Sequence, residues 1–207
     1  MEEGKLSKKD IKIVIAAHKP YRMPEDTMYV PLHVGAEGKK NPDGTPLDLG
    51  YQKDNEGDNI SAKNPNYCEL TGIYYAWKNI PAEYLGLVHY RRYFKGKNKS
   101  KDPFACIVTE PEMEKIFETH RIVVPKKRKY YIETLYSHYA HTHYAEHLDC
   151  VREIIGEQCP DYLNSYDKVI KQTSGYMFNM MVMERALFDS YCAWLFAILF
   201  ELEKMGW

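Results

Sequence analysis

Short apolar runs alternate with helical repeats along the chain. Two continuous apolar runs without polar alternation, typical of strands buried on both faces, are IKIVIAA at 11–17 and YLGLVH at 84–89. Further extended segments are predicted at 28–34, 121–124 and 174–183. Helices are predicted at 64–80, 109–120, 131–158 (with a break near His143), from Pro160, and at 184–204. This alternation predicts an α/β fold with a mostly parallel central sheet flanked by helices.

Local signals locate several of the element ends. Asn64-Pro65 predicts a helix N-cap with proline in the first turn, and Ile80-Pro81 ends that helix. The T-x-x-E pattern at 109–112 is a capping box. Segment 35–58 is rich in Gly, Asn, Asp and Lys and predicts a long loop, which is uncommon unless it is functional.

Charge and cysteine content narrow the function classes. The 28 basic and 29 acidic residues leave a net charge of -1, which argues against a general nucleic-acid binder. A short basic run, Lys126–Lys129, is most often a solvated turn; the weaker alternatives are nucleic-acid contact or attraction to anionic lipid. Five scattered cysteines without C-x-x-C fit a reducing cytosol.

Targeting signals are not visible in the sequence. The charged start of the chain has no apolar signal-peptide core, and the longest apolar run, Cys192–Phe200, is too short to span a bilayer. We therefore expect a cytoplasmic protein without a transmembrane segment, able to contact the inner face of the membrane peripherally.

Polar side chains follow two of the predicted strands, where open α/β sheets bind ligands. His18-Lys19 follows the first run, and Tyr90, Arg91 and Arg92 follow His89 at the end of another. Guanidinium groups donate paired hydrogen bonds that match phosphate oxygens, although surface salt bridges are the plainer interpretation.

A second polar group precedes the predicted helix at 64–80. These residues could bind an anion at the helix N-terminus, or they could simply cap the helix. They are Asp58, Asn59, Ser61, Lys63 and Asn64. Glu69, inside that helix, is a candidate general base, although a solvated carboxylate is the commoner case. Ser174-Gly175 could let the backbone approach a ligand or could be an ordinary turn.

Other candidate chemistries have weaker support. Four histidines, which favour packing or polar contacts over a metal site, are His138, His141, His143 and His147. The sequence contains no P-loop, dinucleotide-binding or nucleophile-elbow motif, and no D-x-D pair to hold a divalent cation on a diphosphate.

Several strings resemble a known family. They are IKIVIAAHKPYRMP, YVPLHVGAE, DNISAKNPNYCELTGIYYAWKN, YLGLVHYRRYF and SGYMFNMMVMERALFDSYCAWLF. They resemble bacterial domain-of-unknown-function family 4422, whose members are often labelled capsular or exopolysaccharide glycosyltransferases. The resemblance implies a GT-A-like nucleotide-sugar transferase fold, with a nucleotide-binding half at 1–125 and an acceptor-side half at 126–207. The family usually continues beyond the last helix, so a C-terminal segment is expected to be missing here.

The resemblance also implies roles for individual residues. HYRR stands where the D-x-D motif would be, so Arg91 and Arg92 are expected to neutralise the diphosphate, with His89 orienting it or sharing a proton. The candidate catalytic carboxylates are Asp58 and Glu69. The residues expected to bind the nucleotide sugar are Ala17, His18, Lys19, Val34, Gly35, Asn59, Ser61 and Asn64. Those expected to face the acceptor are Ser174, Gly175 and Asn179.

Two hypotheses follow from the sequence and the resemblance. In the first, the protein transfers a sugar from a nucleotide diphosphate sugar to a growing surface glycan or a lipid-linked acceptor. No cofactor is predicted to be required, and Mn²⁺ or Mg²⁺ held without D-x-D is the alternative. In the second, the chain is a non-catalytic nucleotide- or glycan-binding module whose 18 tyrosines stack on sugar rings.

Overall fold

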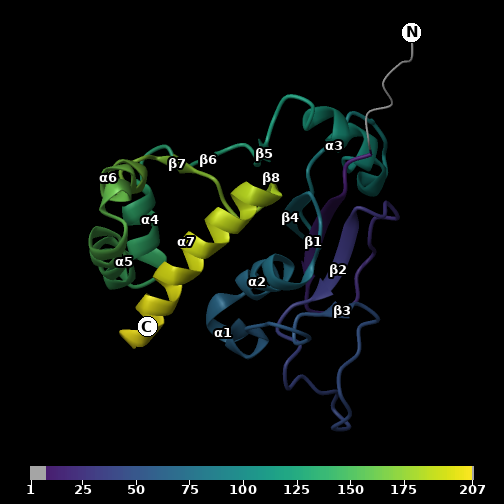
Figure 1. The fold of residues 1–207 in the computed structure, drawn as a ribbon, viewed down its shortest axis with the longest axis horizontal. Helices are drawn as coiled ribbons and strands as arrows, with labels where there is room; N and C mark the ends of the chain where they lie inside the picture. The colour runs from purple at the N-terminus through teal and green to yellow at the C-terminus, as the bar shows by residue number, and fades with distance from the viewer. Residues whose placement is uncertain (1–7, 207) are drawn as a thin grey trace. The chain divides into compact units, whose positions relative to one another are not determined.

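The computed structural model describes residues 8–206, which form two units (Figure 1). Within the described residues, the first unit runs to Val124 and also contains Asn179–Asp189. The second contains Pro125–Phe178 and continues from Ser190 along the last helix. The chain passes between the units after Val124, and Asn179–Asp189 belongs to the first unit although it follows most of the second. The division into a nucleotide-binding and an acceptor-side half stays a prediction.

The first unit is built on a six-stranded sheet with strand order β3-β2-β1-β4-β8-β5. The strands are β1 (Ile11–Ala17), β2 (Tyr29–His33), β3 (Gln52–Lys53), β4 (Tyr84–His89), β5 (Ile122–Val123) and β8 (Met181–Glu184). The first four in the order are parallel, whereas β8 pairs antiparallel with both β4 and β5. The predicted α/β fold with a mostly parallel sheet is confirmed, with one antiparallel strand, β8, between β4 and β5.

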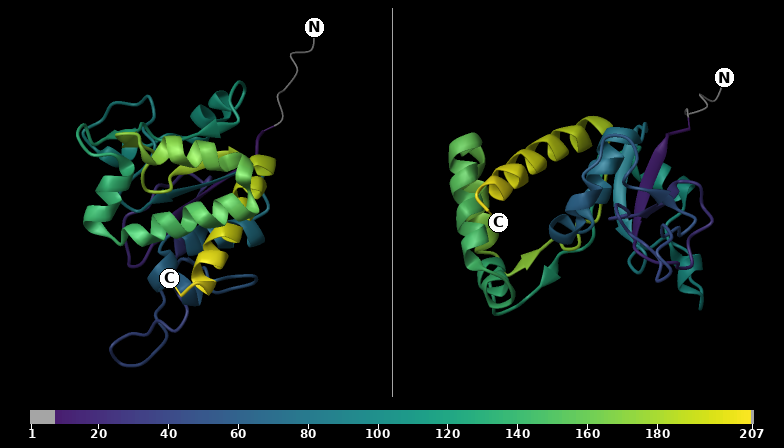
Figure 2. Two further views of the ribbon diagram at one scale, coloured as in Figure 1. Left: turned by 90° about the vertical axis from the view of Figure 1, so that its left-hand side faces the viewer. Right: turned by 90° about the horizontal axis from the view of Figure 1, so that it is seen from below.

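Nearly every side chain of β1 and β4 is buried, so both faces of the sheet are covered. The helical elements of the unit are η1 (Ser61–Lys63), α1 (Asn64–Tyr67), α2 (Leu70–Asn79), η2 (Pro103–Cys106) and α3 (Glu110–Ile116). Helix α2 covers one face of the sheet (Figure 2). On that face, Gly72 lies beside Leu32 and Leu87. On the other face, Ile13 and Ile15 share a core cluster with Met113 and Phe117 of the segment that follows β4.

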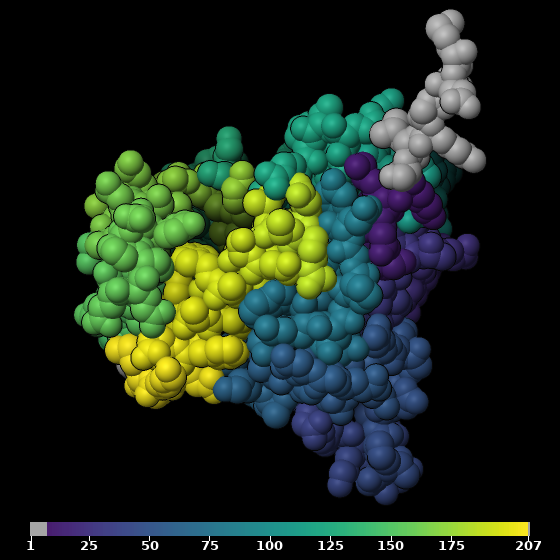
Figure 3. All heavy atoms as spheres, viewed as in Figure 1, coloured from purple at the N-terminus to yellow at the C-terminus, as the bar shows by residue number. Residues whose placement is uncertain are grey.

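The long predicted loop between β2 and α1 is mostly irregular but holds the short strand β3. Its middle part projects from the first unit in Figures 1 and 3. There, Asn41 and Thr45 are hydrogen-bonded through their backbones, and Asp43 accepts hydrogen bonds from the Thr45 amide (2.9 Å) and hydroxyl (2.6 Å). The projection is therefore a turn that supplies its own polar partners.

The second unit consists of helices and a small sheet. Its elements are β6 (Arg128–Lys129), α4 (Leu135–Thr142), α5 (Ala145–Gln158), η3 (Pro160–Tyr162), α6 (Leu163–Ile170), β7 (Ser174–Gly175) and most of α7 (Arg185–Lys204). The predicted helix break at His143 is confirmed, because α4 ends with His143 in an extended conformation. Strands β6 and β7 pair antiparallel.

Several predicted elements differ in extent. The helix expected from residue 131 begins at Leu135, and the helix expected to end at residue 120 ends at Ile116. The single strand expected at 174–183 is two strands in different sheets, because Phe178 (φ 70) and Asn179 (φ 51) turn the chain between them. The helix expected at 64–80 is broken by Cys68, with φ 49 and ψ -127. Asn64 does not cap this helix either: it is the first residue of α1, and its side chain donates to the Cys68 carbonyl at 2.7 Å.

Candidate functional site

The parallel strands bring most of the predicted ligand-binding segments to one edge of the sheet. The register pairs Ala16 with His89 and Ala17 with His33, so β1, β2 and β4 end side by side. His18-Lys19, Val34-Gly35 and the residues after His89 all leave the sheet there. This carboxyl edge is where open α/β sheets bind ligands.

The chain turns sharply after β4. The amide of His89 donates to the Arg92 carbonyl at 3.1 Å, and the amide of Arg92 donates back to the His89 carbonyl at 2.9 Å. The Tyr90 amide donates to Ala16 at the end of β1. These bonds fix Tyr90 and Arg91 at the tip of a tight turn beside β1, with Arg92 exposed on the same turn.

Aromatic rings support the guanidinium group of Arg91. The Tyr90 and Tyr21 rings stack with centroids 3.7 Å apart and planes inclined by 13°. The guanidinium carbon of Arg91 lies 5.0 Å from the Tyr90 centroid and 5.8 Å from that of Tyr21, within cation–π range. In the described part of the chain, no carboxylate forms an ion pair with Arg91. Its charge is therefore positioned but not neutralised.

His18 joins the same group of side chains. Its ring meets Tyr90 edge-on with centroids 5.3 Å apart. The pKa of His18 is lowered, first by burial and then by the nearby charges of Lys19 and Arg91. His18 is therefore mainly neutral at pH 7 and adds no positive charge beside Arg91.

A cavity of about 480 Å³ opens beside this turn. Its lining is aromatic and basic and comprises Tyr90, Arg91, Tyr93, Phe94, Lys95, Pro103, Phe104, Cys106 and Ile107. Within residues 8–206, the buried hydroxyl of Tyr93 has no hydrogen-bond partner, and burial raises its pKa to about 12. This cavity was not predicted from the sequence, although the dense aromatic residues of HYRRYF were a signal for it.

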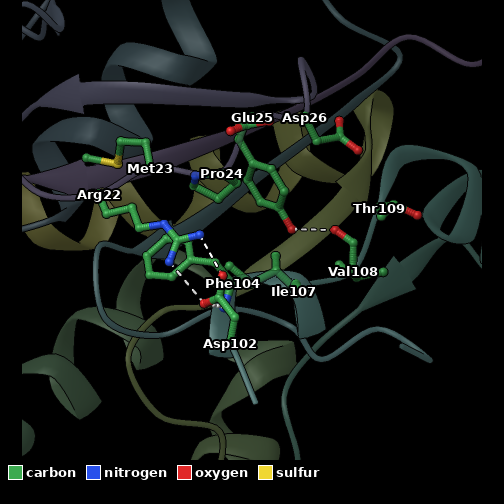
Figure 4. A pocket seen from close by; sticks show the side chains of 12 residues that line it. Arg22, Met23, Pro24, Glu25, Asp26, Asp102, Phe104, Ile107, Val108 and Thr109 are labelled. Carbon is green, nitrogen blue, oxygen red and sulfur yellow. Dashed lines mark hydrogen bonds and ion pairs between the residues drawn. The ribbon is translucent and has the colours of Figure 1, made fainter. Parts of the chain in front are cut away.

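A neighbouring cavity of about 310 Å³ has a different character (Figure 4). Arg22 in its wall donates to both carboxylate oxygens of Asp102, at 3.0 and 2.7 Å, and lies over the Phe104 ring at 4.4 Å. The Tyr29 hydroxyl donates to the Val108 carbonyl at 2.9 Å. Unlike Arg91, Arg22 is neutralised by its carboxylate partner.

A buried carboxylate organises the loop that follows β2. Asp54 is fully buried directly after β3, and each of its oxygens accepts one backbone amide and one hydroxyl hydrogen bond. The amides belong to Gly35 (2.7 Å) and Ala36 (3.0 Å), and the hydroxyls to Ser61 and Thr71 (2.6 Å). The sequence analysis did not identify Asp54, because nothing local marks the position as buried.

This network gives three predicted nucleotide-sugar residues an internal role. The Ser61 hydroxyl is buried on Asp54, and the Asn64 amide donates to the Thr71 hydroxyl at 3.2 Å. Gly35 has φ +66, and an added Cβ would overlap the Asn64 side chain. These residues shape the edge of the sheet, and direct ligand contact by them stays a prediction.

The two carboxylates nominated as bases lie at opposite ends of α2. Asp58 accepts a hydrogen bond from the Tyr74 hydroxyl at 3.1 Å, and its backbone is bonded to the side chain of Asn79, the last residue of α2. Glu69 immediately precedes the first residue of α2. Nine residues of helix rise about 14 Å. The structure thus does not bring Asp58 to the end of α2 where Glu69 lies. Neighbouring Asn59 closes a local turn through the Ser61 amide.

Glu69 and Asn179, which are 110 residues apart in sequence, meet. The Asn179 side-chain amide donates to a Glu69 carboxylate oxygen at 2.9 Å. The β4–β8 pairing ends with Leu87 and Met181, and Asn179 lies in the turn two residues before Met181. Positive φ values at Cys68 (49°) and Asn179 (51°) border this pair. Strained backbone of this kind is found preferentially at functional sites.

The remaining predicted acceptor residues lie in the second unit. Ser174 and Gly175 form β7 and pair with Lys129 and Arg128 of β6. An added Cβ at Gly175 would press on the ends of the Met177 and Leu135 side chains, so Gly175 lies against the packing of its own unit. The three predicted acceptor residues are therefore divided between the units.

The histidine-rich segment is engaged internally. Glu133 accepts hydrogen bonds from His138 (3.0 Å) and His141 (2.6 Å), and Tyr139 is hydrogen-bonded to His147 (3.1 Å). Among residues 8–206, no group of three or more His, Cys, Asp and Glu side chains is arranged to hold a metal ion. In the same range, no helix is long and apolar enough to cross a membrane.

Comparisons with known proteins agree with this architecture. No curated protein matches the sequence. A solved structure of the bifunctional glycosyltransferase WbbM in its apo form is similar, with a TM-score of 0.83 and 30% sequence identity. The match covers 94% of this chain but only 37% of the WbbM chain. The model of the family described as domain of unknown function DUF4422 matches residues 12–206, and the chain therefore belongs to the DUF4422 family.

Proposed function

We propose that this chain is a GT-A-type glycosyltransferase domain that uses a nucleoside diphosphate sugar as donor. The likeness to WbbM indicates a glycosyltransferase-related role. The observation that carries the proposal is the Arg91 guanidinium, supported by two tyrosine rings and without a carboxylate partner among the described residues, at the carboxyl edge of the sheet. A diphosphate is the anion that such a planar, fixed charge binds well.

The proposed reaction assigns a task to each group. The acceptor hydroxyl oxygen bonds to the anomeric carbon as the bond from that carbon to the diphosphate oxygen breaks, and the nucleoside diphosphate leaves with the bonding electrons. Arg91 and Arg92 neutralise its growing negative charge, which a divalent cation does in many transferases. Glu69, oriented by Asn179, takes the proton of the acceptor hydroxyl. The acceptor we propose is a surface glycan or its lipid-linked precursor.

Nucleotide binding tests the role of the arginine. Isothermal titration with UDP, GDP and ADP in the presence of EDTA is expected to identify one that binds. Arg91→Ala is expected to weaken that affinity about 10- to 100-fold, the value of a charge-assisted hydrogen bond. Arg22→Ala is the matched control, because Arg22 also lies over an aromatic ring but is paired with Asp102. Equal losses in both variants, or binding only with added Mn²⁺, would contradict the proposal.

Turnover separates an enzyme from a binding module. Donor-sugar hydrolysis or transfer is expected to fall on the order of 100-fold in Glu69→Gln, with nucleotide affinity unchanged, because general-base catalysis contributes about 10²–10⁴-fold. Asp58→Asn makes the same chemical change at the other end of α2. A larger loss in Asp58→Asn would assign the base to Asp58. Nucleotide binding without turnover in the wild-type protein would favour the non-catalytic module.

A further inference from the structure

An exposed basic segment of the second unit continues directly into exposed apolar side chains. Lys126–Lys129 are all exposed, and the last two form β6 against β7. The Tyr130 amide donates to the Thr173 carbonyl at 2.7 Å, which holds the chain at the end of β6. The four cations are therefore displayed on a fixed edge.

The next two side chains project into solvent. Tyr131 is 82% exposed and Ile132 is 93% exposed. A tight turn presents them, with the Ile132 amide donating to the Tyr130 carbonyl at 2.7 Å and with Tyr131 at φ 62. A third ring, Tyr176, is 57% exposed beside β7, and the Lys127 ammonium lies 5.2 Å from its centroid. An isoleucine side chain that is almost fully exposed gains little free energy from burial when the unit folds.

We propose that this surface, formed by Lys126–Ile132 and Tyr176, docks the protein on an anionic lipid bilayer. Lysine and arginine side chains are attracted to anionic headgroups. Tyrosine rings favour the interface, and an aliphatic side chain gains from entering the acyl region. Charge complementarity selects lipid as the occupant: four exposed cations precede the apolar tip in the chain, and the nearest carboxylate in sequence, Glu133, accepts hydrogen bonds from His138 and His141.

The surface contains more than the basic run alone indicates. The first unit has a comparable run of lysines at 95, 97, 99 and 101, all exposed, in a segment without large apolar side chains. If charge alone held the protein on lipid, the two runs would be equivalent. Docking through the Tyr131–Ile132 turn requires the basic run at 126–129. The lysines at 95, 97, 99 and 101 therefore provide a matched control within the same chain.

Vesicle co-sedimentation tests the proposal. The wild-type chain is expected to bind vesicles of phosphatidylcholine with about one-third phosphatidylglycerol, more weakly at higher salt, and to bind pure phosphatidylcholine poorly. Replacing Lys126, Lys127 and Lys129 with alanine is expected to weaken binding on the order of 100-fold, about fivefold per lysine. The same change at Lys97, Lys99 and Lys101 should have little effect. Tyr131→Ser with Ile132→Ser should weaken binding at least tenfold, and circular dichroism verifies its fold.

Several outcomes would overturn this inference. One is equal loss in the two triple-lysine variants, which would show attraction by charge without a docking surface. Another is full binding by the Tyr131→Ser, Ile132→Ser variant. A third is wild-type protein that ignores anionic vesicles but binds single-stranded RNA or self-associates through this surface. None of these results depends on nucleotide binding at Arg91, so the inference and the proposed function fail separately.

Discussion

Replacing Asp54 with asparagine tests how the carboxyl edge of the sheet is held. Each carboxylate oxygen of Asp54 accepts one backbone amide, from Gly35 or Ala36, and one hydroxyl, from Ser61 or Thr71. An asparagine NH₂ group would face one of these pairs. The hydroxyl can rotate and accept instead, but the backbone amide cannot, so a buried donor loses its acceptor.

The magnitude follows from the number of bonds affected. An unsatisfied buried amide costs about 1–3 kcal/mol, and the remaining bonds lose their charge assistance. We therefore expect Asp54→Asn to lower the free energy of unfolding by about 3 kcal/mol. With an m-value of about 2 kcal/mol/M, the urea midpoint of the first unit should fall by about 1.5 M.

Urea unfolding followed by tyrosine and tryptophan fluorescence measures this effect. Asp43→Asn is the control, because Asp43 also accepts an amide and a hydroxyl but lies in the exposed loop, and its midpoint should hardly change. A midpoint for Asp54→Asn as high as that of the control would refute the reasoning, since the buried network would then not depend on the carboxylate.

Two further predictions concern the same edge of the sheet. Gly35→Ala should lower the free energy of unfolding by about 2 kcal/mol or more, because of backbone strain and overlap with Asn64. The control is Gly38→Ala, at a similar φ but with open space around it, which should lower the free energy of unfolding by only about 1 kcal/mol. Equal falls in the two urea midpoints would argue against the overlap. Burial lowers the pKa of His33, so the unfolded chain takes up the proton first and stability should fall as the pH drops below about 6.5, by up to about 1.4 kcal/mol per pH unit. His33→Phe should flatten this fall in urea midpoints measured between about pH 7.5 and 5.5, and an unchanged slope would assign the acid sensitivity elsewhere.

Much of the candidate site followed from strand ends that the sequence identifies. The apolar runs at 11–17 and 84–89 predicted β1 and β4, and the polar residues after them, His18 and Arg91, lie at the same edge of the sheet. Asp58 and Glu69 were equivalent candidates at that stage. Only the tertiary contacts separated them: the Asn79 side chain donates to the Asp58 carbonyl and accepts from its amide, whereas the Asn179 side chain donates to the Glu69 carboxylate.

The sequence alone determined the type of most elements, because continuous apolar runs, helical repeats and the capping box are patterns of residues close together in the chain. The tertiary structure decided which distant segments meet: the antiparallel strand β8, the Glu69–Asn179 pair, and the burial of Asp54. The physical reason is range. The pattern of neighbouring residues determines the secondary structure of a segment. The hydrogen-bond partners of Asp54 and Glu69, 17 and 110 residues away in sequence, depend instead on how the sheet and its loops pack.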